Sequence, residues 1–370
     1  MINFTGTSAV VYYLTELSNA LSQGNDITII IPEQAEFENL DPDVSLVKFS
    51  FPSGLFRSML KVFDFSLYKR LTKEINYVNP DIIHITHELR FPFFFAWLVH
   101  RNYPVVVTIH EPKPFSLGLI RKILIDKIQL INGKLIAKVS DKVIVHGEQH
   151  KRYILQQNIP SGKIEVIPHG EFSFFARYSK GVTKTIQNNI LFFGRITSYK
   201  GIEYLIQAGK LIEEHIPDVT ITIAGEGDFA KYKTLIEGND RFILCNRFIQ
   251  DEEVAEFFQK ASLVVLPYID GSQSGIISIA YAFRKPVVAT DVGNFSEMVE
   301  NGETGFIVPP KDSDALAKAI IKLLKDVDLR AKMGENGYRL MRERMQWDKI
   351  AEKTLATYVE AVKLWREKNK

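Results

Sequence analysis

The sequence has very little cysteine and no long apolar run. Cys245 is the only thiol among the 370 residues, which excludes an intrachain disulfide framework and is compatible with a reducing compartment. Residues 1–10 contain neither the basic cluster nor the apolar run of a secretory signal. The longest candidate membrane segment, residues 91–99, is far shorter than the ~20 residues that a spanning helix needs. These absences lead us to expect a cytoplasmic protein without a spanning helix.

An excess of charge and several catalytic motifs are missing as well. The 46 basic and 44 acidic residues leave a net charge of +2, which argues against a dedicated nucleic-acid binder. There is no paired His/Cys spacing of the kind that binds metals, so we expect no metal site. The sequence also has no Gly-x-Ser-x-Gly elbow and no Walker loop. No catalytic pattern of these kinds competes with the site proposed below.

Short β-branched runs alternate with amphipathic helical patterns along the whole chain. The runs predict parallel strands that are covered on both faces, at residues 27–31, 81–85, 105–109, 142–145, 163–167, 190–193, 219–224, 242–244, 263–266, 287–289 and 306–308. Helices are predicted at residues 8–22, 201–215, 251–259, 276–283 and 347–365. This alternation predicts an α/β fold built from βαβ units.

At this length two domains are the default, because a single core stops growing at roughly 250–300 residues. The polar segment 178–187 has no strong period and marks the boundary. We predict two doubly wound, Rossmann-like domains that face a cleft, at residues 1–178 and 179–345, and a helix at 346–370 that packs across the junction. Only residues 1–4 precede the first helix, where a doubly wound domain has its central first strand. Either that strand is very short or the sequence starts downstream of its natural beginning, and we expect the latter, so that the amino domain lacks its first strand.

Two cations and a small-residue turn suggest a diphosphate site. Gly194, Arg195 and Lys200 follow the strand at 190–193, and Ser272-Gln273-Ser274-Gly275 precede an apolar helix. Ligands of α/β proteins bind beyond the carboxyl ends of strands, and free amides at a helix start bind phosphate. The alternatives are that the two cations are solvated, and that Ser272 or Ser274 only caps the helix. We favour contact with a diphosphate, whose charge the cations would stabilise.

In combination, Gly194-Arg195, Lys200-Gly201, Ala224-Gly-Glu-Gly227 and the stretch 272–293 resemble the retaining glycosyltransferases of family four, which have the GT-B fold. The resemblance covers nearly the whole chain. It implies a hexosyltransferase of polysaccharide biosynthesis that moves a sugar from a nucleotide-diphosphate sugar to a hydroxyl of a glycan or lipid-linked acceptor. It also implies retention at the anomeric carbon without a metal, with Arg195 and Lys200 on the donor diphosphate.

The sequence departs from the family at one motif. The family's usual pair of glutamates, separated by seven residues, would fall at Gly271 and Ile279, and neither is acidic. Asp270 lies one place earlier and could substitute for the first glutamate. The Ser-Gln-Ser-Gly version resembles that of one branch of the family. The alternatives are therefore a catalytically silent GT-B scaffold or binding partner, and a nucleotide-sugar epimerase of related fold.

Two further turns of the second half are candidates for donor binding. Gly225 and Gly227 follow a buried strand, and they indicate either a tight turn that needs positive φ or the edge of the nucleotide site. Asn246, Arg247 and Phe248 follow the next strand. The resemblance implies that the base lies near them.

The first half offers a histidine and a hinge. His110 ends the strand at 105–109, and the resemblance implies that it faces the donor sugar and the acceptor; the alternative is an ordinary strand-end histidine. Gly6 and the turn His169-Gly170-Glu171 are candidates for acceptor contact or for a hinge. Weaker candidates are Glu111, His84 and His87.

The segment 113–142 is basic and apolar in alternation. Its seven cations, against two acidic residues, are Lys113, Arg121, Lys122, Lys127, Lys134, Lys138 and Lys142. The pattern indicates either a solvated helix face or a face that contacts anionic lipid, peripherally on the inner membrane surface, or a lipid-linked acceptor.

Overall fold

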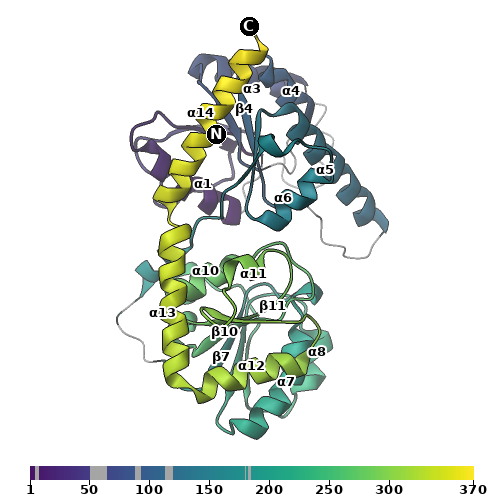
Figure 1. Ribbon diagram of the computed structural model, residues 1–370, viewed down its shortest axis with the longest axis vertical. Coiled ribbons are helices and arrows are strands. Elements are labelled where there is room, and N and C mark those ends of the chain that lie inside the picture. Colours follow the sequence, from purple (N-terminus) through teal and green to yellow (C-terminus); the bar gives the residue numbers. More distant parts are fainter. Residues whose placement is uncertain (5–7, 51–64, 88–92, 113–119, 180, 182–184) are drawn as a thin grey trace. The chain divides into compact units, whose positions relative to one another are not determined.

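The computed structural model describes residues 1–4, 8–50, 65–87, 93–112, 120–179, 181 and 185–370. It divides into an amino-terminal unit, Met1–Gly170 with Gln346–Lys370, and a carboxyl-terminal unit, Glu171–Met345 (Figure 1). The division falls at Gly170–Glu171 rather than near residue 178. The reason is that Phe174 and Phe175, in the 3-10 helix η2 (Ser173–Tyr178), are buried in the carboxyl-terminal unit, where η2 packs on α9 (Asp251–Lys260).

The sheet of the amino-terminal unit is parallel. β1 (Thr28–Pro32) pairs with β2 (Ser45–Phe49). The other strands follow in the order β3 (Ile83–Ile85), β4 (Val105–Ile109), β5 (Lys142–Val145) and β6 (Ile164–Val166). The sequence predicted five of these strands; β2 was missed.

Residues 1–4 lie between β1 and β3. Ile2 forms bridges with both Ile30 and Ile85. The Ile2 amide donates to the His84 carbonyl at 2.9 Å, and the Asn3 amide donates to the Ile30 carbonyl at 3.0 Å. A very short first strand therefore occupies the central position of the sheet. The expectation that the amino domain lacks its first strand is wrong, because these backbone groups find partners on both sides.

Helices cover both faces of this sheet. They are α1 (Ser8–Ser22), α3 (Phe65–Val78), α4 (Phe93–His100), α5 (Ile120–Val139), α6 (Glu148–Leu155) and α14 (Trp347–Lys368). Val106 and Ile144 pack with α1 and α14, whereas Val105, Val107 and Val143 pack with α3 and α4. Neighbouring strand residues thus enter opposite cores, which explains why the strands are apolar at successive positions.

The last helix, α14, is fastened to the amino-terminal unit by polar contacts. Lys368 Nζ lies 3.1 Å from the buried carboxylate of Asp141, and Trp365 Nε1 donates to the His100 carbonyl at 2.9 Å. The Tyr358 hydroxyl lies 2.7 Å from His84 Nδ1. The helix that the sequence assigned to the junction is therefore an integral part of this unit.

The carboxyl-terminal unit holds a six-stranded parallel sheet in the order β12-β11-β10-β7-β8-β9. Its strands are β7 (Asn189–Phe193), β8 (Thr220–Ala224), β9 (Phe242–Cys245), β10 (Leu263–Leu266), β11 (Val287–Thr290) and β12 (Gly305–Val308). The chain runs outward from β7 through β9 and then returns to place β10 on the other side of β7. The strand order therefore reverses between β7 and β10, which is where ligands of doubly wound folds bind.

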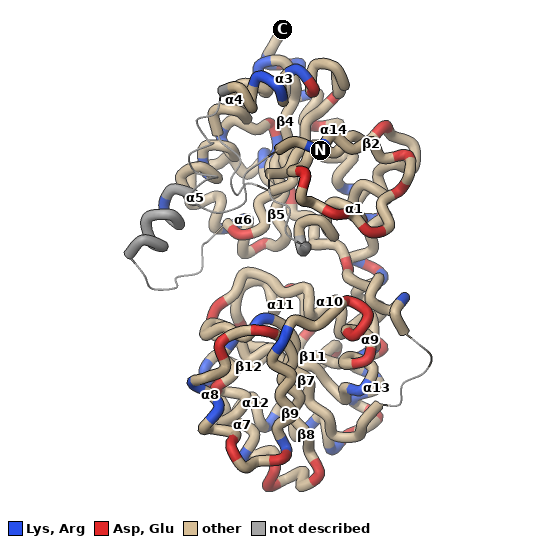
Figure 2. The backbone as a smooth tube through the Cα atoms, turned by 180° about the vertical axis from the view of Figure 1, so that it is seen from behind, with Lys and Arg blue, Asp and Glu red and all other residues tan. Residues whose placement is uncertain are grey.

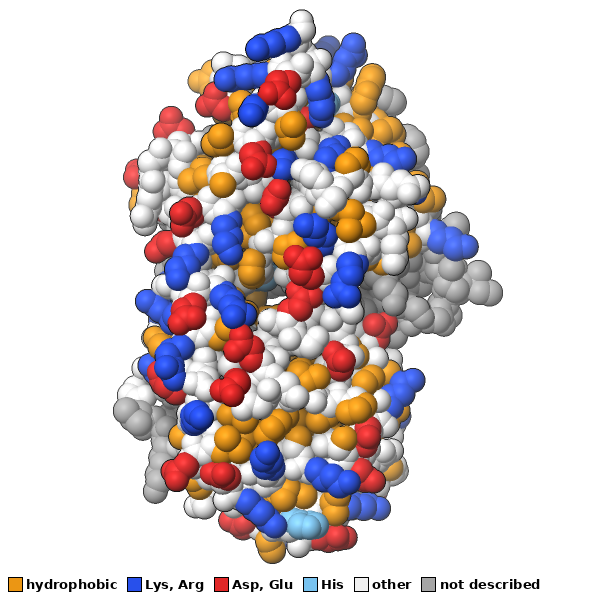
Figure 3. Space-filling view, viewed as in Figure 1, with side chains coloured by type: hydrophobic (Ala, Val, Ile, Leu, Met, Phe, Trp, Pro, Cys, Tyr) orange, Lys and Arg blue, Asp and Glu red, His pale blue; other side chains and the backbone are white. Residues whose placement is uncertain are grey.

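Helices of the carboxyl-terminal unit follow its strands. They are η3 (Ser198–Lys200), α7 (Ile202–His215), α8 (Ala230–Ile236), α9, α10 (Gly275–Ala282), α11 (Phe295–Met298), α12 (Ser313–Lys325) and α13 (Val327–Arg344). Basic and acidic segments intermingle in both units (Figure 2), and charges of both signs are scattered over the face drawn in Figure 3. This mixture agrees with the small net charge of the chain.

Candidate active site

Lys200 is a buried cation at the point where the strand order of the carboxyl-terminal sheet reverses. It ends η3, in the loop after β7, and is 8% exposed. Its ammonium lies 4.8 Å from the centre of the Tyr268 ring, in the loop after β10. Among the described residues no carboxylate forms an ion pair with it. An uncompensated buried charge is costly, so a buried ammonium without a carboxylate partner suits an anionic ligand.

The backbone around this ammonium is set by Gly194. This glycine has φ of +115°, and a Cβ atom there would lie 2.9 Å from Lys200 Nζ. Arg195, the second predicted cation, is exposed and has no carboxylate partner in the described parts of the chain. The Ile269 amide donates to the Tyr199 carbonyl at 2.7 Å, so the loops after β7 and β10 are held together.

The loop Ser272–Gly275 enters α10 as predicted, but its serines do not cap the helix through their side chains. Ser274 is the N-cap residue without a side-chain capping bond, and its hydroxyl lies 3.4 Å from that of Tyr268. The hydroxyl of Ser272 is buried and has no partner among the described residues. Gln273 is half-buried. A Cβ atom on Gly275 would lie 2.5 Å from the Phe172 ring, so this glycine also serves packing.

Two neighbouring polar side chains were missed by the sequence analysis. Asn294, after β11, is 1% exposed. Its backbone N–H donates to the Ser272 carbonyl at 2.8 Å, but neither polar atom of its side chain has a partner in the described structure. The Thr197 hydroxyl, after β7, is also buried and has no hydrogen-bond partner in the described structure. Each buried group without a partner costs about 1–3 kcal/mol unless water or a ligand satisfies it. The signal was a small polar residue just beyond a buried strand.

The remaining predicted donor residues are divided between two places. Asp270 accepts a hydrogen bond from the Gly271 amide at 2.9 Å in the loop after β10. Asn246 binds the backbone of Gly227 in both directions, at 3.1 and 3.2 Å, and thereby holds the turn after β8. Gly225 and Gly227 both have positive φ, which agrees with the tight-turn interpretation.

Two exposed residues follow β9 near this turn. Arg247 forms an exposed ion pair with Glu253, and hydrogen bonds from its guanidinium lower the pKa of that carboxyl to about 2. Phe248 is 55% exposed. Arg247 is thus already paired with a carboxylate, whereas Lys200 is not.

In the amino-terminal unit four histidines follow the ends of β3 to β6: His87, His110, His146 and His169. His110 Nε2 lies 2.9 Å from the Thr86 carbonyl, and its Nδ1 lies 3.0 Å from His146 Nε2. Burial lowers the pKa of His110 well below its ordinary value. The structure thus brings His110 together with a second buried histidine, His146, that the sequence analysis missed.

The hinge candidates have structural partners. His169 Nδ1 lies 2.8 Å from the Gly170 carbonyl, and a Cβ atom on Gly170 would collide with the Trp347 ring at 2.3 Å. The Ser173 amide donates to the Glu171 carboxylate. Gly6 lies outside the described residues. These contacts favour a structural role for the turn.

Two family models match the chain. "Glycosyltransferase Family 4" matches residues 6–170, and "Glycosyl transferases group 1" matches residues 187–326, so together they cover more than four fifths of the sequence. The chain belongs to the glycosyltransferases of the family-4 type. The resemblance of the sequence motifs to that family is thereby confirmed at the level of the family.

Relatives and solved structures agree with this assignment. An uncharacterized glycosyltransferase of Methanocaldococcus jannaschii is 29% identical over 56% of each chain, so the match spans little more than half of that protein. A phosphatidyl-myo-inositol mannosyltransferase of Mycobacterium leprae is 25% identical over 95% of this chain and 92% of its own.

Two solved structures share the fold. A sucrose-phosphate synthase from Thermosynechococcus elongatus has a TM-score of 0.77 at 20% identity, over 97% of this chain and 98% of its own. Anabaena HepE in complex with UDP-glucose has a TM-score of 0.70 at 17% identity, over 96% and 98%. The two-domain GT-B fold expected from the motifs is confirmed.

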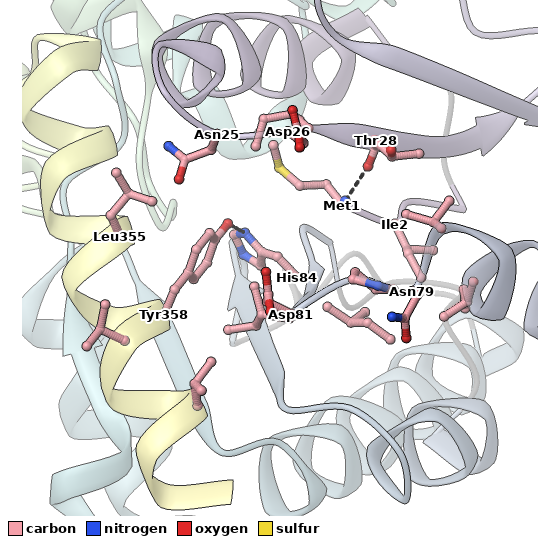
Figure 4. A pocket seen from close by; sticks show the side chains of 18 of the residues that line it. Met1, Ile2, Asn25, Asp26, Thr28, Asn79, Asp81, His84, Leu355 and Tyr358 are labelled. Atoms are coloured by element: carbon pink, nitrogen blue, oxygen red, sulfur yellow. Dashed lines mark hydrogen bonds between the residues drawn. The ribbon is translucent and has the colours of Figure 1, made fainter. Parts of the chain in front are cut away.

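The glycosyltransferase has a cavity at the edge of the amino-terminal sheet where β1 and β3 begin, opposite the carboxyl ends of these strands (Figure 4). It has a volume of about 930 Å³, and its wall includes Asn25 and Asp26 before β1, Asp81 before β3, and Leu355 and Tyr358 of α14. Of the candidates named from the sequence, only the weak candidate His84 lines it. Because ligands of such sheets bind at the carboxyl ends of the strands, this cavity is not the predicted donor site.

The basic segment of the glycosyltransferase is smaller than its composition indicated. Lys142 is 4% exposed, and its ammonium contacts the Glu165 carboxylate at 2.9 Å and also that of Glu360, so it does not belong to a solvated face. Lys127 and Lys138 are exposed on α5, and Ile131 is 59% exposed. Lys113 lies outside the described residues, and Arg121 and Lys122 lie outside those whose side chains are described.

The described residues contain no cluster of three His, Cys, Asp or Glu side chains able to hold a metal ion. Over the same residues, no helix is both long enough and apolar enough to cross a membrane.

Proposed function

We propose that this glycosyltransferase transfers a hexosyl group from a nucleotide-diphosphate sugar to a hydroxyl of a glycan or lipid-linked acceptor, with retention at the anomeric carbon. The observation that supports the donor class is the buried ammonium of Lys200 without a carboxylate partner, where the strand order reverses. A diphosphate supplies the negative charge that this position lacks. HepE, solved with UDP-glucose, offers a precedent for the donor on this fold.

The polar groups around Lys200 suit such a donor. The hydroxyls of Thr197 and Ser272 and the amide of Asn294 can each donate and accept, as sugar and ribose hydroxyls require. The first amides of α10 could bind an anion placed at the start of that helix. These groups would form hydrogen bonds to a bound donor. Polar groups that are already in place stabilise the transition state better than water, which must reorient.

In the transfer step the bond between the anomeric carbon and the diphosphate oxygen breaks, and its electron pair stays on the diphosphate. Lys200, with the exposed Arg195, would stabilise that charge and supply what a divalent ion supplies in other transferases. The acceptor hydroxyl oxygen forms the new bond on the same face. Its proton passes to the departing phosphate, because the motifs contain no carboxylate nucleophile.

The test is donor turnover by the full chain over a panel of UDP- and GDP-sugars. We expect Lys200→Ala to lower turnover by about 10²- to 10³-fold, the loss of one contact to transition-state charge. Lys210→Ala, an exposed lysine on α7, is the matched control and should leave turnover unchanged. Equal turnover in both variants would refute the role of Lys200.

A second candidate rests on the missing acidic pair. Ile279 is 5% exposed within α10, so no polar side chain stands where the family's second glutamate holds the donor. A silent scaffold would show no thermal stabilisation by any nucleotide of the panel. An epimerase would convert the donor sugar without an acceptor, which product analysis would detect.

A peripheral membrane contact is a further part of the proposal. Lys127, Lys138 and the exposed Ile131 on α5 form a small basic and apolar surface that suits anionic lipid. Co-flotation with phosphatidylglycerol vesicles, but not with phosphatidylcholine vesicles, would support it. Unchanged flotation of a Lys127→Glu/Lys138→Glu variant would contradict it.

A further inference from the structure

His110 and His146 form a chain of three hydrogen-bonding contacts that ends on two backbone carbonyls. His110 Nε2 lies 2.9 Å from the Thr86 carbonyl oxygen. His110 Nδ1 lies 3.0 Å from His146 Nε2, and His146 Nδ1 lies 2.9 Å from the Ile167 carbonyl oxygen. Both rings are more than nine-tenths buried.

Counting protons along this chain gives an odd number. A carbonyl oxygen only accepts, so each outer contact needs an N–H on the ring. The inner contact between the two rings needs one further N–H. Three contacts therefore require three protons, whereas two neutral imidazoles carry two. With three protons every contact is made, and the pair has one positive charge. A fourth proton would place two N–H groups against each other.

We propose that His110 and His146 share one proton as a single unit, and that His146 is thereby a positioning residue for His110 in sugar transfer. The role in transfer rests on the proposed function; the proton sharing does not. With the shared proton, both ring nitrogens of His110 are occupied. Without it, and with His146 still donating to Ile167, His110 donates through Nδ1 to His146, and its Nε2 lone pair faces the Thr86 carbonyl, so Nε2 becomes an acceptor that gains by turning to a hydroxyl group. His146 thus decides whether His110 offers charge or an acceptor.

The groups that face the pair do not replace this proton. Tyr13 of α1 meets both rings edge-on, with centroids 4.8 Å from His110 and 5.8 Å from His146. Burial raises the pKa of Tyr13 to about 12, so it stays neutral. The other titratable groups of the described structure around the pair are His84, His87, Glu111, His150 and His169. Glu111 is the one acid among them, and it is exposed.

Neighbouring charges and the carbonyls act in opposite directions. Burial is the largest effect and, with charge on His169 or His87, lowers the pKa of both rings, whereas the Thr86 and Ile167 carbonyls favour the cation and offset only part of that lowering. Two coupled rings in this position titrate with values that belong to the pair. The distinguishing feature is therefore the number of protons taken up, which is one for two histidines.

The first test measures protons directly, without substrate. Imidazole nitrogen shifts of isotope-labelled histidines in the full chain are followed from about pH 8 down to about pH 4, below the range in which histidine ordinarily titrates, because burial lowers the pKa of both rings. We expect the signals of His110 and His146 to move together with uptake of one proton. In His146→Gln, the His110 signals should titrate alone, at a shifted midpoint. Two independent one-proton titrations, or a His110 titration unchanged by His146→Gln, would overturn the proposal.

The second test separates positioning from packing. His146→Leu should lower kcat by about ten- to a hundred-fold with little change in donor KM, because a misplaced His110 affects the chemical step. His146→Gln, which can still donate and accept, should recover part of that loss. The pH profile of kcat should change in both variants.

Ser140→Ala is the control, since Ser140 is also buried in the same unit and its hydroxyl donates to the Ile136 carbonyl at 2.7 Å. We expect it to lower stability but to leave kcat and its pH profile unchanged. Equal kinetic losses in Ser140→Ala and His146→Leu would show a structural role and refute positioning. Absence of any turnover in the wild type would instead count against the proposed function, and the proton count would still be decided by the shifts.

Discussion

The ammonium of Lys200 lies over the ring of Tyr268, 4.8 Å from its centre, although the two residues belong to loops that follow different strands. The ring is itself 3% exposed and lies 5.2 Å from the Phe295 ring, after β11. Loops from three neighbouring strands thus fix one cation. This arrangement leads to predictions about the ring, the backbone and the polar groups around it.

Tyr268→Leu should weaken nucleotide binding. A partly desolvated cation–π contact contributes about 1–2 kcal/mol, so the dissociation constant of UDP or GDP should rise by about 5- to 30-fold. Tyr268→Phe keeps the ring and should stay within about two-fold of the wild type. Calorimetric titration with each nucleotide measures both. If Phe and Leu were equally weak, the hydroxyl near Ser274 and not the ring would be the important group.

Gly194→Ala should damage the site and the fold together. The new Cβ atom would lie 2.9 Å from Lys200 Nζ, and the positive φ costs about 1–2 kcal/mol of stability in any residue with a side chain. Gly238→Ala is the control, because Gly238 also has positive φ but nothing lies within 4 Å of its added Cβ atom. Both variants should lose stability in denaturant titrations, and only Gly194→Ala should lose nucleotide binding as well.

Ser272→Ala should not destabilise the protein without ligand. Its buried hydroxyl has no partner in the described structure, so its removal should change the free energy of unfolding by about 0–1 kcal/mol in the stabilising direction. Ser278→Ala should instead cost about 1 kcal/mol, because that buried hydroxyl donates to the Gly275 carbonyl at 2.9 Å. Nucleotide should raise the melting temperature of Ser272→Ala less than that of the wild type. The opposite order of stabilities would contradict a ligand role for Ser272.

Asp141 should make stability fall in acid. Burial alone would raise the pKa of its carboxyl, but hydrogen bonds from His100, the Val105 amide and Lys368 outweigh burial and lower that pKa. A depressed pKa stabilises the fold above the unfolded value of about 3.9, and this contribution is lost as the pH falls through the folded value.

Asp141→Asn should therefore lower stability at neutral pH by about 1–3 kcal/mol and flatten the acid limb of the stability curve. Denaturant unfolding at a series of pH values measures both effects. An unchanged acid limb would mean that other carboxylates dominate it.

Much of the fold was predictable because its strands are covered on both faces. Continuous β-branched runs such as residues 105–109 are typical of strands buried on both faces. Each predicted strand lies within about two residues of the observed one. β2 was missed because its residues are mostly exposed at a sheet edge, so Ser45 and Lys48 interrupt the apolar run. Strand order could not be predicted, since it depends on pairings between distant segments.

The site was predictable in its cations and less so in its surroundings. Lys200 was found from its place after a strand, but its lack of a carboxylate partner is a property of the folded chain. Lys142 was wrongly assigned to a basic face, because Glu165 and Glu360 are remote in sequence and composition does not show the pairing. His146 gave no signal of its own, since a single histidine at a strand end is ordinary until its neighbour is known.

The chain leaves the amino-terminal unit at Gly170 and re-enters it at Gln346, and the Glu171 amide donates to the Met345 carbonyl at 2.9 Å. The carboxyl-terminal unit thus has the form of an insert whose two ends meet. A protein of residues 171–345 alone would therefore need only a short linker to join its two ends. Circular permutants that are opened within an exposed turn of this unit should keep its sheet intact.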